Sequence, residues 1–271
     1  MKRMLMLTPC LFAATLAQAA DQPLWELGAG LGLLSIPDYR GSAERRDYVL
    51  PIPYFVYRGE VLQVDREKVR GLLYKGEHYE WDLSMGANVP VRSRDNAARS
   101  GMPDLDPTVE VGPQWSYKWR GDAAAVTLRL PVRKVLALDF PHLRDAGAVF
   151  TPSIAYDADV QPVQGLHGSV STGPLFGDRK YFDYYYGVTA AQAAPGRPAW
   201  AAKSGYGGWQ LTGTLTRRFQ NFWVGGFVRG DYLGGAAFDD SPLVKKRMSV
   251  MGGIGVSWIF AQSARKADAT R

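Results

Sequence analysis

The chain has 271 residues and carries 32 Lys and Arg against 26 Asp and Glu, a formal net charge of +6. Glycine (30 residues) and aromatic residues (14 Tyr, 11 Phe and 8 Trp) are abundant, and charged residues make up 21%. This composition excludes a bundle of membrane-spanning helices, which would be far more apolar. The positive charge is spread without a long basic run, which argues against nucleic-acid binding and for mild attraction to anionic lipid or glycan.

The first predicted element is a cleaved signal peptide over residues 1–20. Lys2 and Arg3 form its positive start, an apolar stretch follows, and Ala17-Gln18-Ala19 fits the small-x-small cleavage pattern. The apolar run is shorter than the roughly 20 residues that a membrane anchor needs. We therefore expect export through the Sec pathway. Cys10 is the only cysteine and lies in this segment, so the mature chain would have no disulfide and no cysteine metal site.

Beyond residue 20 the chain alternates with a period of two. In 79–89, Tyr79, Trp81 and Leu83 share one face, while Glu80 and Asp82 lie on the other. Alternation over ten or more residues is a strand signal. We predict strands at 25–33, 79–89, 108–119, 126–133, 209–219, 222–232 and 248–260, and weaker ones near 48–57, 61–73, 148–157, 165–175 and 181–191.

The length of these strands separates two all-β architectures. Strands of soluble sandwiches average about five or six residues, whereas a tilted membrane strand needs about 9–11. Aromatic residues near strand ends, such as Trp119 and Trp258, match the girdles of outer-membrane barrels. We predict an all-β fold, an antiparallel transmembrane β-barrel of about 12 strands over residues 21–260. A polar tail, 261–271, follows and is expected to be disordered.

The turns agree only partly with this barrel. Short turns are predicted at 120–122 and 220–221, and long segments at 35–47, 91–107, 192–207 and 234–246. Outer-membrane barrels have short periplasmic turns and long outer loops. Counting back from the last strand puts 220–221 in the periplasm, but it also puts 91–107 there and 120–122 outside. Either a strand is miscounted or the barrel departs from the rule, and ten strands is the alternative.

The alternation also predicts which side chains face inward. The charged residues expected in the lumen are Glu80, Asp82, Glu110, Lys118, Arg129 and Arg133. They favour a network of ion pairs that fills a narrow lumen, with a path for small solutes as the alternative, since about 12 strands lies between filled and open barrels. We predict that Leu128, Leu130, Leu211, Leu215, Val250 and Ile254 face lipid, and that Arg129, Gln210, Thr212 and Ser249 face inward.

No motif nominates a catalytic, cofactor-binding or metal site. The glycine run at 28–32 is not followed by a helical pattern, as a nucleotide-binding loop would be. His78, His142 and His167 lie far apart without metal-ligand spacing, and no G-x-S-x-G motif occurs. We therefore expect no cofactor and no enzymatic activity.

Several motifs, taken together, form a pattern that is specific for one protein family. They are Pro37-Asp38-Tyr39-Arg40-Gly41-Ser42, Leu50-Pro51-Ile52-Pro53-Tyr54, Tyr184-Tyr185-Tyr186-Gly187-Val188, Asp240-Ser241-Pro242-Leu243-Val244 and Trp258-Ile259-Phe260. In order and spacing, from about residue 24 to 260, the chain resembles the MltA-interacting protein family, also called OmpV-like. The resemblance implies an outer-membrane barrel of a Gram-negative bacterium without known enzymatic activity. It implies a scaffold that links a lytic transglycosylase to a peptidoglycan synthase.

Other members of that family look like adhesins or porin-like proteins, so a narrow channel or an adhesin-like protein is the alternative function. The expected partners are outer-membrane lipid and lipopolysaccharide, a lytic transglycosylase and a peptidoglycan synthase, with no nucleic acid. The motif residues lie mostly in turns and loops, where a partner could touch them. The candidate contact residues are Pro37, Asp38, Tyr39, Gly41, Ser42, Tyr186, Gly187, Val188, Asp240, Ser241 and Pro242.

Overall fold

The computed structural model describes residues 23–58, 62–64, 69–121, 124–161 and 163–266. Their dominant feature is one antiparallel sheet of thirteen strands. The strands are β1 (Trp25–Pro37), β2 (Arg45–Arg58), β3 (Leu62–Val64), β4 (Val69–Lys75), β5 (Tyr79–Asn88), β6 (Thr108–Arg120), β7 (Ala124–Asp139), β8 (His142–Phe150), β9 (Ser153–Asp159), β10 (Leu166–Gly177), β11 (Gly205–Arg218), β12 (Phe222–Tyr232) and β13 (Met248–Gln262). The helix α1 (Arg179–Tyr186) and the short 3-10 helices Ser93–Asp95, Ala97–Arg99 and Ala190–Gln192 complete the described elements. The predicted signal peptide and tail residues 267–271 lie outside the described residues.

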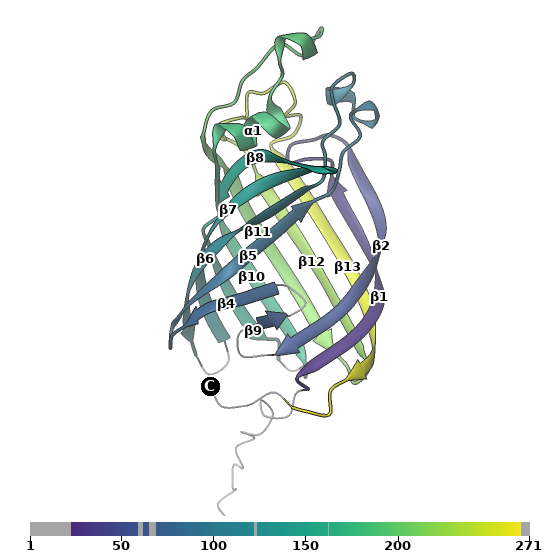
Figure 1. Cartoon of the computed structure of the whole chain (residues 1–271), viewed down its shortest axis with the longest axis vertical. Coiled ribbons are helices and arrows are strands. Elements are labelled where there is room, and N and C mark those ends of the chain that lie inside the picture. The colour runs from purple at the N-terminus through teal and green to yellow at the C-terminus, as the bar shows by residue number, and fades with distance from the viewer. Residues whose placement is uncertain (1–22, 59–61, 65–68, 122–123, 162, 267–271) are drawn as a thin grey trace, which may run out of the picture.

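Twelve of these strands pair in a closed ring (Figure 1). Each strand from β1 to β7 pairs with the next, β7 pairs with β9, and the pairing continues from β9 to β13. The ring closes where β13 pairs with β1, with Glu26 opposite Gln262. The β8 strand pairs with the end of β7 and meets β10 at only two positions, so the β7–β8 hairpin extends beyond the ring. The predicted antiparallel transmembrane barrel of about twelve strands is confirmed.

The faces of the strands are as the alternation predicts. Leu211 on β11 and Ile254 on β13 are 54% and 64% exposed on the outer surface, while Gln210 and Thr212 line an internal cavity. Leu128 is half-buried but lies opposite the exposed Ile154 in the register, which places it on the same outer face. The outer surface carries a broad apolar band because only that side meets hydrocarbon.

The predicted strand at 181–191 is wrong. Residues 179–186 form α1, whose first turn is capped by Asp178, with the Tyr181 amide donating to Asp178 Oδ1 at 2.7 Å. The tyrosine run favours a strand by intrinsic preference. The cap hydrogen bond and the burial of Tyr181, Phe182 and Tyr186 on one side of the helix outweigh that preference.

A second difference compensates for the first. The region 61–73, predicted as one strand, holds β3 and the start of β4, which pair with each other. The total of twelve strands is therefore right. The strand predicted at 181–191 is absent, and one additional strand precedes 79–89. This difference reverses the direction along the barrel axis of every strand from 79–89 to 165–175. The loop at 89–107 now lies with the other long loops and the turn near Gly121 with the short turns, so the usual loop rule holds and the ten-strand alternative is wrong.

The two ends of the barrel differ in structure (Figure 1). At one end lie the short turns, the start of β1 and the end of β13, and the Leu24 amide donates to the Arg265 carbonyl at 2.9 Å. The described tail residues 261–266 are thus held beside β1. At the other end four long loops gather around α1, and the largest cluster of buried apolar residues lies there. By the length of its turns, the first end is periplasmic and the second is extracellular. Within the described part of the chain, no helix is long and apolar enough to cross a membrane.

Candidate functional site

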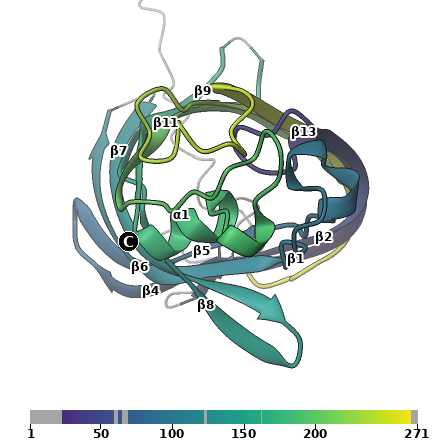
Figure 2. The ribbon, with the colours of Figure 1, turned by 90° about the horizontal axis from the view of Figure 1, so that it is seen from above.

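The extracellular mouth of the barrel is covered by a packed cap. Figure 2 shows α1 lying across the opening, with loops from several strands around it. The cap comprises α1 and the loops 38–44, 89–107, 187–204 and 233–247. Phe238 is fully buried at its centre, stacks on Tyr186 with ring centroids 3.8 Å apart, and packs against Phe182 at 4.8 Å. Buried aromatic pairs of this kind fix the loops to one another.

Three hydrogen bonds between motif residues tie α1 and two of these loops, 38–44 and 233–247, to one another. The Tyr39 hydroxyl donates to the Leu243 carbonyl at 2.9 Å, and the Tyr186 hydroxyl donates to the Arg40 carbonyl at 3.0 Å. The Ser241 hydroxyl donates to the Tyr186 carbonyl at 2.8 Å. These motifs thus converge in space, although Tyr39 and Leu243 lie 204 residues apart in sequence.

The loop 89–107 is joined to the loop 38–44 and to α1 through polar groups. Asn96 Nδ2 donates to Asp38 Oδ2 at 2.8 Å and to Ser42 Oγ at 3.0 Å. Arg46 pairs with the same aspartate at 2.7 Å. Arg99, which is buried, donates to the Tyr185 carbonyl at 3.1 Å. Because these polar groups are paired, their burial in the cap does not leave unsatisfied charge.

Burial in the cap changes the acidity of its tyrosines. Loss of hydration raises the pKa of Tyr184 to about 12. Burial also raises the pKa of Tyr39, Tyr181, Tyr185 and Tyr186 well above the ordinary tyrosine value. All five hydroxyls are therefore neutral at physiological pH, and those of Tyr39, Tyr184, Tyr185 and Tyr186 make hydrogen bonds.

The structure places the predicted contact residues within this cap. Seven of them are buried: Asp38, Tyr39, Gly41, Ser42, Tyr186, Val188 and Ser241. Pro37, Gly187 and Pro242 are partly exposed, and Asp240 is exposed. Gly41 adopts a left-handed φ of 89°, and its amide donates to Ser249 Oγ at 2.7 Å. Most of the motif therefore holds the cap together from within, a role that loop position alone did not indicate.

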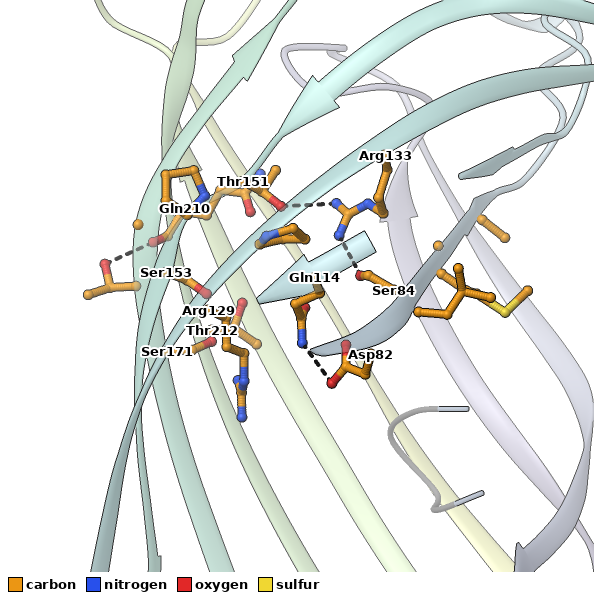
Figure 3. Close-up of a pocket in the computed structure, with 18 of the residues that line it drawn as sticks. Asp82, Ser84, Gln114, Arg129, Arg133, Thr151, Ser153, Ser171, Gln210 and Thr212 are labelled. Carbon is orange, nitrogen blue, oxygen red and sulfur yellow. Dashed lines mark hydrogen bonds between the residues drawn. The ribbon is translucent and has the colours of Figure 1, made fainter. Parts of the chain in front are cut away.

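Below the cap, the middle of the lumen contains a polar cavity of about 590 Å³ (Figure 3). Its wall includes Asp82, Ser84, Gln114, Arg129, Arg133, Thr151, Ser153, Ser171, Gln210 and Thr212. Arg133 donates to Glu110 Oε2 at 2.9 Å, to Ser84 Oγ at 3.2 Å and to Thr151 Oγ1 at 3.0 Å. A smaller cavity of about 320 Å³ lies between this one and the cap.

The six predicted lumen residues do not all meet. Asp82, Arg129 and Arg133 line the polar cavity, and Glu110 lines the smaller one above it. Glu80 and Lys118 are half-buried on β5 and β6 nearer the periplasmic turns and line neither cavity. Arg129 lies 3.8 Å from Asp157. The lumen thus contains both paired charges and open space.

Sequence reasoning did not nominate two further charge clusters on the inner wall. Glu26 pairs with Arg58 at 2.9 Å and with Arg218 at 3.2 Å near the periplasmic end. Asp231 pairs with Arg229 at 2.8 Å and with Arg40 at 3.2 Å beneath the cap. The same period-two rule would have found Glu26, Arg229 and Asp231, because each lies at an inward position of its strand.

A third cavity, of about 670 Å³, lies in the lumen against β1, β2 and β11 to β13. Ile52, Tyr54, Trp223 and Phe227 line it together with the glycines of β1, β12 and β13. Its walls are largely apolar, which is unusual for the interior of a membrane barrel. Among the residues that the structure describes, no group of three or more His, Cys, Asp or Glu could hold a metal ion.

A closed antiparallel barrel with an apolar outer band, a partly polar lumen and unequal ends defines the class: this is an outer-membrane β-barrel protein. The family model described as MltA-interacting protein MipA matches residues 29–260. The chain belongs to this family, as its motifs indicated.

Solved structures with some likeness include a porin, a channel and a transporter. The NanC porin is 9% identical with a TM-score of 0.38, covering 86% of this chain and 98% of that one. The CymD monoaromatic hydrocarbon channel is 12% identical with a TM-score of 0.27, covering 91% and 69%. The toluene transporter TodX of P. putida is 10% identical with a TM-score of 0.28, covering 92% and 72%. These likenesses are too distant to bear on function. No curated protein sequence matches the chain.

Proposed function

We propose that this outer-membrane barrel is a non-enzymatic scaffold that binds a lytic transglycosylase at its periplasmic end and brings it together with a peptidoglycan synthase. The observation that carries the proposal is the cap. Four loops and α1 close the extracellular mouth through buried aromatic contacts and paired polar groups. A barrel closed in this way suits anchoring better than passage of solutes.

The name of the family supports the choice of partner. Its description is MltA-interacting protein, and a lytic transglycosylase works on the periplasmic side, where peptidoglycan lies. The cap faces away from that compartment. We therefore assign partner binding to the periplasmic turns, and we assign contact with lipid and lipopolysaccharide to the apolar band and the extracellular rim.

The periplasmic end offers a mixed apolar and polar surface. Val160 and Val163 on the β9–β10 turn and Phe219 after β11 are exposed. The Arg217 guanidinium lies over the Phe219 ring at 4.7 Å. The two turns are neighbours, since Leu166 pairs with Arg217 in the register of β10 and β11. Exposed aromatic and aliphatic side chains beside arginine are typical of protein contact surfaces.

Site-specific photo-crosslinking in envelope tests this assignment. A photoreactive residue at the exposed Gln220 should capture a lytic transglycosylase, and one at the exposed Ala193 in the cap should not. Capture of that enzyme with equal yield from both positions, or from neither, contradicts the proposal. Identifying the captured proteins by mass spectrometry also tests whether a peptidoglycan synthase is present in the same complex.

A second candidate function, a narrow channel, is favoured by the cavities in the lumen. It requires the cap to open, whereas the first function does not. Recording from planar bilayers separates the two. Steady conductance steps from the folded native barrel would favour the channel, and a closed native barrel favours the scaffold.

A further inference from the structure

The polar and apolar cavities of the lumen adjoin. Thr212 on β11 lines both of them. From Gln210 to Thr216, the inward side chains of this strand run from the polar cavity into the apolar one. Volumes of about 590 and 670 Å³ both fall within the range of roughly 300–1,000 Å³ that small-molecule sites occupy. The two cavities therefore meet at Thr212, and we call them the polar half and the apolar half of the luminal space.

The apolar half owes its volume to glycines on the inner face. Gly32, Gly225, Gly253 and Gly255 contribute no side chain to this part of the wall. A Cβ on Gly255 would meet Ile52 Cδ1 at 2.6 Å, and Trp223 lies just beyond at 3.7 Å. Ile52 and Trp223 thus occupy room that the glycines leave, and the space between the walls stays open. Larger side chains at these positions would fill it.

The polar half offers hydrogen bonds and little net charge. Arg133 is paired with Glu110, and Arg129 faces Asp157. Asp82 Oδ2 accepts from Gln114 Nε2 at 3.3 Å. Around these pairs, Ser153, Ser171 and Gln210 present hydroxyl and amide groups to the cavity (Figure 3). Charges that are already paired do not select an ionic ligand, whereas hydroxyl and amide groups suit a neutral ligand with several hydroxyls.

We propose that the two cavities form one binding site for a neutral amphiphile, with its hydrocarbon chain among Ile52, Trp223 and Phe227 and its hydroxyl-bearing head beside Ser171, Gln210 and Thr212. This site lies in the lumen, enclosed by the barrel wall, and is separate from the periplasmic turns. Binding there does not depend on the scaffold function, and either could hold without the other.

Octyl glucoside is a suitable probe because it combines a short chain with a neutral polyhydroxyl head. Equilibrium dialysis measures binding of the radiolabelled probe to lipid nanodiscs that contain the full-length protein. The amount taken up by empty nanodiscs is subtracted, because it measures partition of the probe into lipid. The expected result is saturable binding of one probe per barrel. Glucose should not bind detectably, because each buried methylene strengthens binding by about fourfold. Tighter binding of octanoate than of octyl glucoside would overturn the assignment of a neutral head.

Two glycine substitutions form a matched pair. Gly255→Leu fills the apolar cavity and should weaken binding at least tenfold, the equivalent of about two buried methylenes. Gly213→Leu adds the same side chain to the outer face of β11, where nothing lies within 4 Å of the new Cβ, and should leave binding unchanged. Unchanged binding by a correctly folded Gly255→Leu barrel overturns the proposal.

A third variant covers the case in which Gly255→Leu fails to fold. Thr212→Val keeps the shape of the side chain and removes the hydroxyl at the junction of the two cavities. It should weaken octyl glucoside binding several-fold, about the worth of one hydrogen bond, while octanol binding stays the same. Equal effects on the glucoside and on octanol would overturn the placement of the head group.

Discussion

Replacing Phe238 with alanine should loosen the cap while leaving the barrel wall intact. The side chain is 0% exposed and contacts Tyr186 and Phe182 through its ring. Truncation of a buried phenylalanine typically costs about 3–5 kcal/mol, because the apolar contact is lost and a cavity remains. If the cap opens as a local unit, its opening equilibrium should shift by roughly a hundredfold to a few thousandfold.

Hydrogen exchange measures this shift directly. Amides of α1, such as that of Phe182, which donates to the Asp178 carbonyl at 3.2 Å, should exchange faster by the same factor, because exchange follows local opening. Amides of β12 should keep their protection. Phe140→Ala is the matched control, since Phe140 is 96% exposed at the same end of the barrel. Unchanged exchange in α1, or equal acceleration in β12, would refute the idea of a separately stabilised cap.

Three further predictions concern the wall, the contact of β8 with α1, and pH. Leu211→Arg, near the middle of β11, should cost about 2–4 kcal/mol in urea unfolding from vesicles, whereas Thr212→Arg on the inner face should cost less; equal costs would contradict the assigned faces. Gly147→Val should release α1 in hydrogen exchange, because φ is 99° and a Cβ there would lie 2.3 Å from Asp178 Oδ1. The control is Gly196→Ala, with φ of 76° and nothing within 4 Å of the new Cβ; it adds only backbone strain and should release α1 far less. Equal release by both variants would show that the contact between Gly147 and Asp178 is unimportant. Burial raises the pKa of Tyr184 from 10.0 to about 12. Between pH 10 and pH 12 the folded cap therefore holds more protons than the unfolded chain. The stabilisation that results is complete below pH 10 and is lost as the pH rises through 12. The difference in tyrosinate absorbance between the native protein and Tyr184→Phe should therefore titrate near pH 12, and titration near pH 10 would show that Tyr184 is solvated.

The wall of the barrel could be predicted because its information is local. Alternation at Leu211 and Thr212 assigns both residues to a face without knowledge of any neighbour. The cap could not be predicted in this way. Tyr186 lies on α1 and Ser241 and Tyr39 lie on two loops, and their hydrogen bonds depend on the arrangement of the whole ring. The tyrosine-rich segment also carries a local preference for a strand, which tertiary contacts override.

In the candidate site too, local features could be predicted from the sequence and long-range contacts could not. The inward charges Asp82, Arg129 and Arg133 follow from strand position, yet their partners do not. Glu110 meets Arg133 because β6 and β7 pair in one particular register, which a bulge or a shift of one residue would change. The cavities are harder still to predict. Their volume depends on side chains from strands that are distant in sequence and close in the ring, such as Ile52 on β2 and Trp223 on β12, which both approach Gly255.

Pairing of β1 with β13 has a consequence for the assembly of the chain. The two strands stand more than two hundred residues apart, and their contact leaves no free edge in the ring. Contacts of such high sequence separation form slowly, because loop-closure entropy opposes them until most of the chain is in place. Until the last strand arrives, both terminal strands expose unpaired backbone groups that could join those of other molecules. A chain cut short before Met248 would keep two such edges in a medium that cannot solvate them, so pairing of β13 with β1 is a condition for a stable barrel in the membrane.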